Sequence, residues 1–236
     1  MFAIHAVYDG RSRRRADYIR DVAEALASTR AVADVRVYGA EGFAVISPDA
    51  DGATTVVLNL LQAGDFAVGI GTTVGAADTV GLQSPDGSPS GAAGVTDTAG
   101  TDGADGAGGT DGTTGPDHLY GAASRSFGGR HRAGTVHTRI ERPGPGGVTA
   151  PGIPAEVAED ITAAFTLLAH VLSRRTPEGR EATALMRQGH LQTEAAEIVG
   201  ITKQAMSQRL AAAGWQAEQA GWTLAVHMLR RASELQ

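Results

Sequence analysis

The sequence predicts an α+β fold, with a ferredoxin-like domain over residues 1–141 and an all-α helix-turn-helix domain over 154–236. Three observations lead to this prediction. Strand and helix signals alternate in the first part of the chain, and apolar residues at helical spacing run through the last part. A Pro- and Gly-rich segment, 142–153, lies between them and is predicted to be a linker. A chain of 236 residues is long enough for two small domains.

The elements of the N-terminal part are predicted from local periodicity. Apolar runs rich in β-branched and aromatic residues indicate strands, and apolar residues three or four apart indicate helices. We expect strands over 2–8, 34–38, 42–46, 66–71 and 135–140, and helices over 14–29, 54–62 and 119–127. This order, β-α-β-β-α-β with an added α-β, is ferredoxin-like or split βαβ. Within the fourth strand, Gly69 and Gly71 are expected to allow another element to pack closely.

One segment, 75–117, is predicted to be a disordered insertion. It is rich in Gly, Asp, Thr and Ala and nearly free of large apolar residues, so it buries too little surface to offset its chain entropy. Residues 76–117 contain seven Asp and no Glu, Lys or Arg, which leaves the rest of the chain at +1 when the total is −6. A nearly neutral body is compatible with nucleic-acid binding, because only one face has to be positive.

The composition argues against several classes of protein. There is no cysteine, and therefore no disulfide, thiolate zinc site or cysteine nucleophile. No run of about 18 apolar residues is present to span a membrane. The N-terminus lacks a basic segment before an apolar one, so we expect no signal peptide and a cytoplasmic location.

Five helices are expected in the C-terminal part, separated by glycines and a Thr-Pro pair. They cover about 155–174, 177–189, 193–199, 203–213 and 215–233. Residues 192–210 within this set resemble a helix-turn-helix. Gly200 fits the left-handed corner position, and a small residue, Ala196, stands where the two helices cross. Met206 and Leu210 are expected to anchor the second helix on the core.

The polar face of that second helix points to double-stranded DNA as a partner. Its expected contacts with bases and phosphates come from Thr202, which also caps the helix, and from Lys203, Gln204, Ser207, Gln208 and Arg209. Few basic residues surround this face, which favours a homodimer that reads two half-sites through the long helices 155–174 and 215–233. The alternatives are an ordinary helical hairpin with a glycine turn and an interaction protein whose helices only assemble subunits.

Short motifs in the N-terminal part carry a family resemblance. They are Asp9-Gly10-Arg11-Ser12-Arg13, Tyr38-Gly39-Ala40-Glu41-Gly42-Phe43, Val68-Gly69-Ile70-Gly71, and Gly115-Pro116 before the helix with Ala122-Ala123-Ser124-Arg125. Their order resembles the SatD-like family of bacterial proteins, which looks like a reduced relative of the nucleotide-cyclase and GGDEF palm. Some members carry a C-terminal helix-turn-helix.

The resemblance implies a position for a metal site. In active palms of this type two carboxylates hold divalent metal, one after the first strand and one on the hairpin. Here Asp9 matches the first, whereas Ala40 stands where the second is expected and Glu41 is its neighbour. We therefore expect no catalytic residue and no cofactor in a regulatory protein, with Mg²⁺ at Asp9 and Glu41 only if the chain is a nucleotide-processing enzyme.

A second candidate site lies where the first helix begins. Arg11, Ser12, Arg13 and Arg14 bring guanidinium groups and backbone N–H groups together, and such a set can hold a phosphate. A small anionic or nucleotide ligand is the partner expected there. The alternative is that these residues are only the basic, solvent-exposed start of a helix and bind no ligand.

Overall fold

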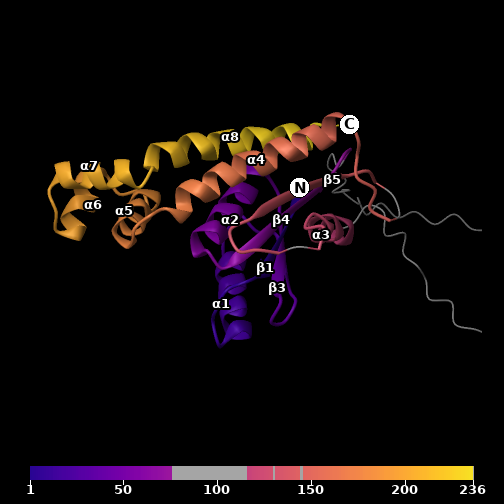
Figure 1. The fold of residues 1–236 in the computed structure, drawn as a ribbon, viewed down its shortest axis with the longest axis horizontal. Coiled ribbons are helices and arrows are strands. Elements are labelled where there is room, and N and C mark those ends of the chain that lie inside the picture. Colours follow the sequence, from indigo (N-terminus) through magenta and orange to yellow (C-terminus); the bar gives the residue numbers. More distant parts are fainter. Residues whose placement is uncertain (76–115, 130, 144–145, 236) are drawn as a thin grey trace, which may run out of the picture.

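A computed structural model describes residues 1–75, 116–129, 131–143 and 146–235 of this chain. The described residues form five strands and eight helices (Figure 1). In chain order these are β1 (Phe2–Tyr8), α1 (Arg15–Ala27), β2 (Asp34–Val37), β3 (Gly42–Ser47), α2 (Ala50–Ala63), β4 (Phe66–Thr73), α3 (Pro116–Arg125), β5 (Val136–Glu141), α4 (Ile153–Ser173), α5 (Pro177–Arg187), α6 (Gln192–Val199), α7 (Lys203–Ala212) and α8 (Trp215–Ser233). The α+β class and the predicted order of strands and helices are confirmed.

Local capping explains where α2 begins and ends. The side chain of Asp49 accepts a hydrogen bond from the backbone N–H of Gly52 at 2.7 Å, which satisfies a free donor of the first turn. Gly64 ends the helix in the left-handed conformation, at φ 79°. The helix therefore starts four residues before the predicted Thr54.

One mixed sheet holds all five strands, in the order β2-β3-β1-β4-β5. Neighbouring strands run antiparallel, except that β5 pairs parallel with β4. The register places Ile4 opposite Val45 on one side and opposite Ile70 on the other. Because side chains alternate between the two faces of a strand, these three residues point to the same face.

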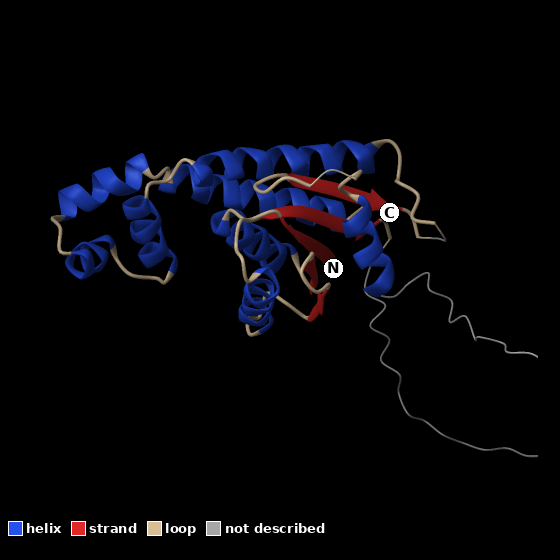
Figure 2. Cartoon of the chain, turned by 60° about the horizontal axis from the view of Figure 1, so that its bottom comes forward, coloured by secondary structure: helices blue, strands red, loops and turns tan. Residues whose placement is uncertain are grey.

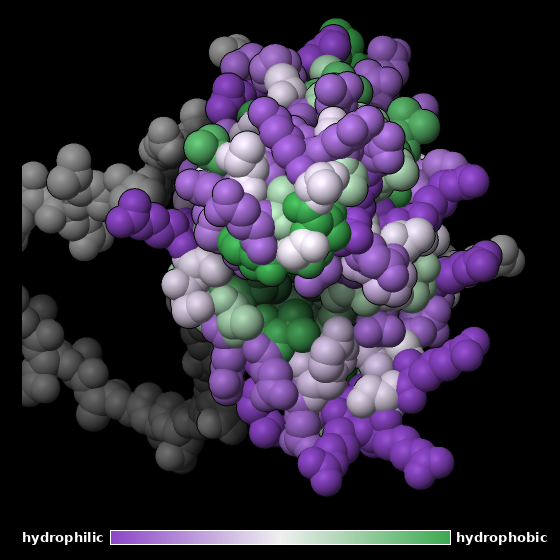
Figure 3. Space-filling model, turned by 90° about the vertical axis from the view of Figure 1, so that its left-hand side faces the viewer, coloured by the Kyte–Doolittle hydropathy of each residue, from purple (hydrophilic) through white to green (hydrophobic). Residues whose placement is uncertain are grey.

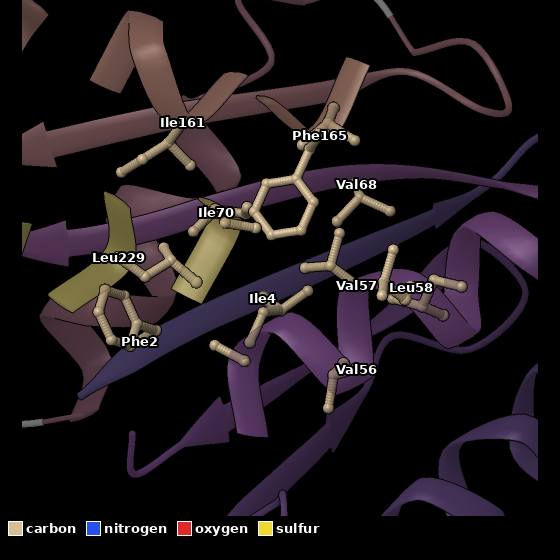
Figure 4. Packing of buried hydrophobic residues seen from close by; sticks show 14 of the residues in the cluster. Phe2, Ile4, Val56, Val57, Leu58, Val68, Ile70, Ile161, Phe165 and Leu229 are labelled. Carbon is tan, nitrogen blue, oxygen red and sulfur yellow. The ribbon is translucent and has the colours of Figure 1, made fainter. Parts of the chain in front are cut away.

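That face of the sheet carries the main hydrophobic core. Helices α1, α2, α4 and α8 cover it, and Phe165 of α4 and Leu229 of α8 lie among Phe2, Ile4 and residues of α2 (Figure 4). The four largest fully buried side chains are the phenylalanines Phe2, Phe43, Phe66 and Phe165. Burying an aromatic or aliphatic side chain of this size contributes about 1.5–3 kcal/mol.

Helix α3 packs on the opposite face through a smaller cluster that includes Leu119, Tyr120 and Ala123. Gly71 of β4 makes this approach possible, because a Cβ at that position would lie 2.2 Å from the backbone nitrogen of Ala123. Gly69 meets the same helix, with a Cβ 2.5 Å from the carbonyl oxygen of Ala123. The predicted role of these two glycines in close packing is confirmed.

The long helices α4 and α8 pack against each other and over the sheet, whereas α5, α6 and α7 gather at one end of this pair (Figure 2). The sequence prediction assigned all five helices to one domain after residue 154. In the structure α4 and α8 share a core with the sheet, and only the short helices form a separate cluster. The amphipathic pattern of a helix indicates that one of its faces is buried, but it does not indicate which element covers that face.

The predicted linker and insertion have different outcomes. Residues 142–143 and 146–150 lie beside the end of β5, since the N–H of Arg142 donates to the carbonyl of Val148 and the N–H of Ala150 donates to that of Ile140. Pro116 and Asp117, predicted to end the disordered insertion, belong to α3. Residues 76–115, the remainder of that prediction apart from Gly75, lie outside the described residues. No helix within the described part of the chain is both long enough and apolar enough to cross a membrane.

Candidate nucleic-acid interface and sheet-face pocket

The three short helices α5, α6 and α7 form a bundle with its own small core, called here the helix-turn-helix bundle. Its buried residues are Ala182, Ala195, Ala196, Met206 and Leu210, and Ile201 and Trp215 pack against them. Ala196, Met206 and Leu210 therefore take the buried positions predicted from the sequence. The small side chain of Ala196 lets α6 and α7 cross closely.

The corner between α6 and α7 follows from two residues. Gly200 ends α6 at φ 74°, a left-handed conformation that costs glycine little. The hydroxyl of Thr202 then accepts a hydrogen bond from the N–H of Ala205 at 3.1 Å and caps α7. Both predictions for this corner are confirmed, and together they fix the direction in which α7 leaves the turn.

The first two turns of α7 present a polar face to solvent. Thr202, Lys203, Gln204, Ser207 and Gln208 are all exposed. Amide, hydroxyl and ammonium groups of this kind donate to base edges and phosphates. The side chains of Lys203, Gln204, Ser207 and Gln208 make no hydrogen bond or ion pair within the described residues.

Arg209, predicted to be part of this face, is placed differently. It is half-buried, and its guanidinium lies 3.9 Å from the carboxylate of Glu181 on α5. Its sequence position allowed either orientation. The ion pair with α5 turns Arg209 toward the bundle, away from the exposed polar residues of α7.

A buried ionic cluster joins the helix-turn-helix bundle to the long helices. Glu218 of α8 accepts hydrogen bonds from Arg175 at 2.6 Å and from Arg187 of α5 at 2.8 Å. Arg175 also donates to the backbone carbonyl of Ala213 at 2.7 Å. Burial lowers the pKa of Arg175, and Glu218 opposes that shift. Sequence analysis missed this cluster because its members are as much as 43 residues apart.

The charge on the bundle is balanced. Residues 176–214 contain four carboxylates and four Arg or Lys side chains. Several of these charges are already paired, as in Arg187 with Glu218 and Arg209 with Glu181. A single bundle therefore offers few free cations to a phosphate backbone.

On the open face of the sheet, beside α3, lies a pocket of about 800 Å³, called here the sheet-face pocket. Its lining is rich in aromatic and histidine rings and includes Arg15 and Glu41. His5 lies in it, and its Nδ1 is 2.9 Å from the hydroxyl of Ser124. Burial, with a further contribution from the charge of His131, lowers the pKa of His5 to about 4, so the ring is neutral at pH 7.

The two predicted metal ligands take different places. Glu41 lines the sheet-face pocket, whereas Asp9 accepts a hydrogen bond from the backbone N–H of Ala133 at 3.1 Å and does not line it. Within the described ranges, no three or more His, Asp or Glu side chains are grouped so that they could hold a metal ion.

The predicted anion cluster stands at the start of α1. Arg11, Ser12, Arg13 and Arg14 are all exposed. The N–H of Ser12 donates to the hydroxyl of Tyr8 at 2.8 Å, and the hydroxyl of Ser12 accepts from the N–H of Arg14 at 3.2 Å. Two of the backbone donors expected to bind an anion are therefore already used within the loop.

Comparisons of this chain with protein-family models, curated proteins and solved structures find no match.

Proposed function

We propose that this protein is a DNA-binding regulatory protein that reads double-stranded DNA through α7. The observation that carries the proposal is the face formed by Lys203, Gln204, Ser207 and Gln208: it is polar, exposed and without partners among the described residues, on a helix held by a glycine corner and an apolar underside. The bundle also stands at one end of the molecule, away from the sheet (Figure 1).

We also propose that strands β1–β4 form a ferredoxin-like unit. The supporting observation is the strand order β4-β1-β3-β2 with every neighbouring pair antiparallel, reached through two crossovers that each skip one strand. Together with α3 and β5 this unit is the scaffold on which the long helices rest. It agrees with the palm that the SatD-like resemblance implies.

Selection of binding sites from randomised duplex DNA, followed by fluorescence anisotropy at several salt concentrations, tests DNA binding. Lys203→Ala should weaken binding to all sequences and reduce the salt slope by about 1, because one phosphate contact is lost. Gln204→Ala and Gln208→Ala should relax sequence preference, at about 1–3 kcal/mol for each lost base contact.

Arg231→Ala is the matched control, because Arg231 is exposed near the far end of α8. The proposal fails if the full chain selects no sequence. It also fails if Lys203→Ala and Gln204→Ala both leave the affinity unchanged, or if Arg231→Ala costs as much as Lys203→Ala.

A homodimer is part of the proposal, since a bundle with balanced charge gains affinity by binding two half-sites. Leu167 of α4 and Leu224 of α8 are 67% and 46% exposed, which offers an apolar contact for a second copy. Sedimentation should show a dimer that becomes monomeric in Leu167→Gln with Leu224→Gln. If the wild-type chain is monomeric at micromolar concentration, the homodimer part of the proposal is wrong.

A second candidate function, metal-dependent nucleotide processing, is favoured by the lining of the sheet-face pocket. Glu41 and Arg15 stand there with Tyr38 and Tyr120, groups suited to a cation, a phosphate and a base. Calorimetric titration with nucleoside triphosphates and Mg²⁺ tests it. Binding that disappears in Glu41→Ala and turnover that disappears in Asp9→Ala would support the enzyme, and absence of any nucleotide binding would exclude it.

A further inference from the structure

We propose that the junction between the helix-turn-helix bundle and the sheet unit, meaning the five strands with α1, α2, α3 and their loops, binds a small, phosphate-rich ligand. Two adjoining cavities, of about 460 and 200 Å³, lie there and share the lining residues Gln62, Leu172 and Arg180. Their walls come from the end of α2, the second half of α4, the loop before β5, and α5. Figure 3 shows this end of the molecule, with a hollow below the nearest helices whose floor is coloured hydrophobic. We call the two cavities together the junction site.

The larger cavity of the junction site is positively charged. Arg132, Arg180 and His170 line it, and no Asp or Glu does. Neither arginine has an ion-pair partner within the described residues. Asp9 is bound to the same loop through the N–H of Ala133, yet it does not line the cavity. Two guanidinium groups without counterions are therefore available to an anion.

The smaller cavity adds to this charge. Arg175 and Arg187 line it, and they share the single carboxylate of Glu218, so one positive charge is left over. The amide nitrogen of Gln62, which lines both cavities, is buried and has no hydrogen-bond partner among the described residues. A buried donor without an acceptor costs about 1–3 kcal/mol, which a bound oxyanion would relieve.

The remaining lining indicates the kind of ligand. Four hydroxyl groups, from Thr135, Thr166, Ser173 and Thr183, stand around the two cavities, but each already donates to a backbone carbonyl. The donors left for phosphate oxygens are the guanidinium groups and the amide of Gln62, and arginine binds phosphate with two parallel bonds. No Phe, Tyr or Trp lines either cavity, and His170 is the one aromatic ring in the lining. The site therefore favours a compact ligand with two or more phosphates.

A ligand at the junction site would touch both units of the protein. Arg180 belongs to α5, whereas Arg132 and Gln62 belong to the sheet unit. Bound phosphate would therefore fix the orientation of the helix-turn-helix bundle relative to the sheet. This consequence for DNA binding rests on the proposed function, but the ligand site itself does not.

Calorimetric titration of the full chain with inorganic pyrophosphate, at constant ionic strength and without DNA, tests the site. We expect saturable binding at one site per chain. Arg132→Gln and Arg180→Gln should each weaken it about tenfold or more, because each removes a charge-assisted hydrogen bond of about 1.5–3 kcal/mol. Arg180→Lys should retain part of the affinity.

Two variants serve as controls. Arg174→Gln removes an exposed cation near the junction that lines neither cavity, and Arg231→Gln removes one from the far end of α8. Both should bind pyrophosphate as the wild-type chain does. Circular dichroism of each variant shows whether it is folded.

Four results would overturn the proposal. The first three are absence of saturable binding, equal affinity in all variants, and loss of binding in Arg13→Gln, at the start of α1, while Arg180→Gln retains it. A fourth is loss of duplex DNA affinity in Arg180→Gln when pyrophosphate itself does not bind, which would make this surface a contact with the DNA backbone.

Discussion

Replacing Glu218 by Gln tests how the helix-turn-helix bundle is attached to the long helices. The side chains of Glu218 and Arg175 are each 2% exposed, and their charged atoms are 2.6 Å apart. Glutamine keeps the size of the side chain and removes its charge, which leaves a buried guanidinium without a carboxylate. Breaking a buried pair from one side costs about 3–5 kcal/mol, so the free energy of unfolding should fall by that amount.

A surface pair provides the matched control. Asp51 and Arg230 are 2.7 Å apart, nearly the same distance, but their side chains are 46% and 55% exposed. Water screens such a pair, and it contributes about 0–1 kcal/mol. Asp51→Asn should therefore cost no more than about 1 kcal/mol. The difference between the two variants isolates the effect of burial.

Urea denaturation followed by tryptophan fluorescence measures both variants, since the two tryptophans of the chain, Trp215 and Trp222, lie on α8. A double variant, Arg175→Met with Glu218→Leu, should recover part of the loss, because the buried guanidinium is gone and the charge left without a carboxylate is that of Arg187, whose side chain is 27% exposed. Equal losses for Glu218→Gln and Asp51→Asn would refute the reasoning that burial makes this cluster essential.

Three further outcomes are expected. Gly71→Ala should lower the free energy of unfolding by about 1–3 kcal/mol in thermal denaturation, because its Cβ would lie 2.2 Å from the nitrogen of Ala123; an unchanged midpoint would contradict the close packing of α3. In Gly200→Ala the added Cβ would have no atom within 4 Å, so the free energy of unfolding should fall by only about 1–2 kcal/mol, the cost of a left-handed backbone at φ 74°. A larger loss would indicate a clash that the structure does not contain. The pKa of His5 is lowered from 6.5 to about 4, mainly by burial, so the unfolded chain takes up this proton first and stability should fall as the pH drops from 6.5 toward 4. The stability lost is below about 3 kcal/mol, because the ring is partly exposed. His5→Asn should flatten the dependence of stability on pH measured by urea denaturation. The same pH profile in wild type and variant would show that His5 is not its cause.

The helix-turn-helix corner could be predicted because every group that forms it lies within a few residues. Gly200, Thr202 and the apolar positions Met206 and Leu210 act through local backbone geometry and helical periodicity. The strands and their order along the chain could be predicted for the same reason. Local patterns of this kind need no knowledge of the rest of the fold.

The junction site and the ionic cluster could not be predicted, because they depend on contacts between distant segments. Gln62 and Arg180 line one cavity although more than a hundred residues separate them. The outward direction of Lys203 and the inward direction of Arg209 differ because Glu181 on another helix pairs with the second. A sequence pattern assigns both residues to a polar helix and cannot choose between these surroundings.

Helix α4 has 21 residues and α8 has 19, and the two lie side by side over the sheet. Buried residues from Val157 to Leu172 belong to the same core as the strands, so α4 is attached along almost its whole length and not at one point. At 1.5 Å per residue this attachment extends over about 22 Å. The sheet core therefore sets the position from which the short helices after α4 begin.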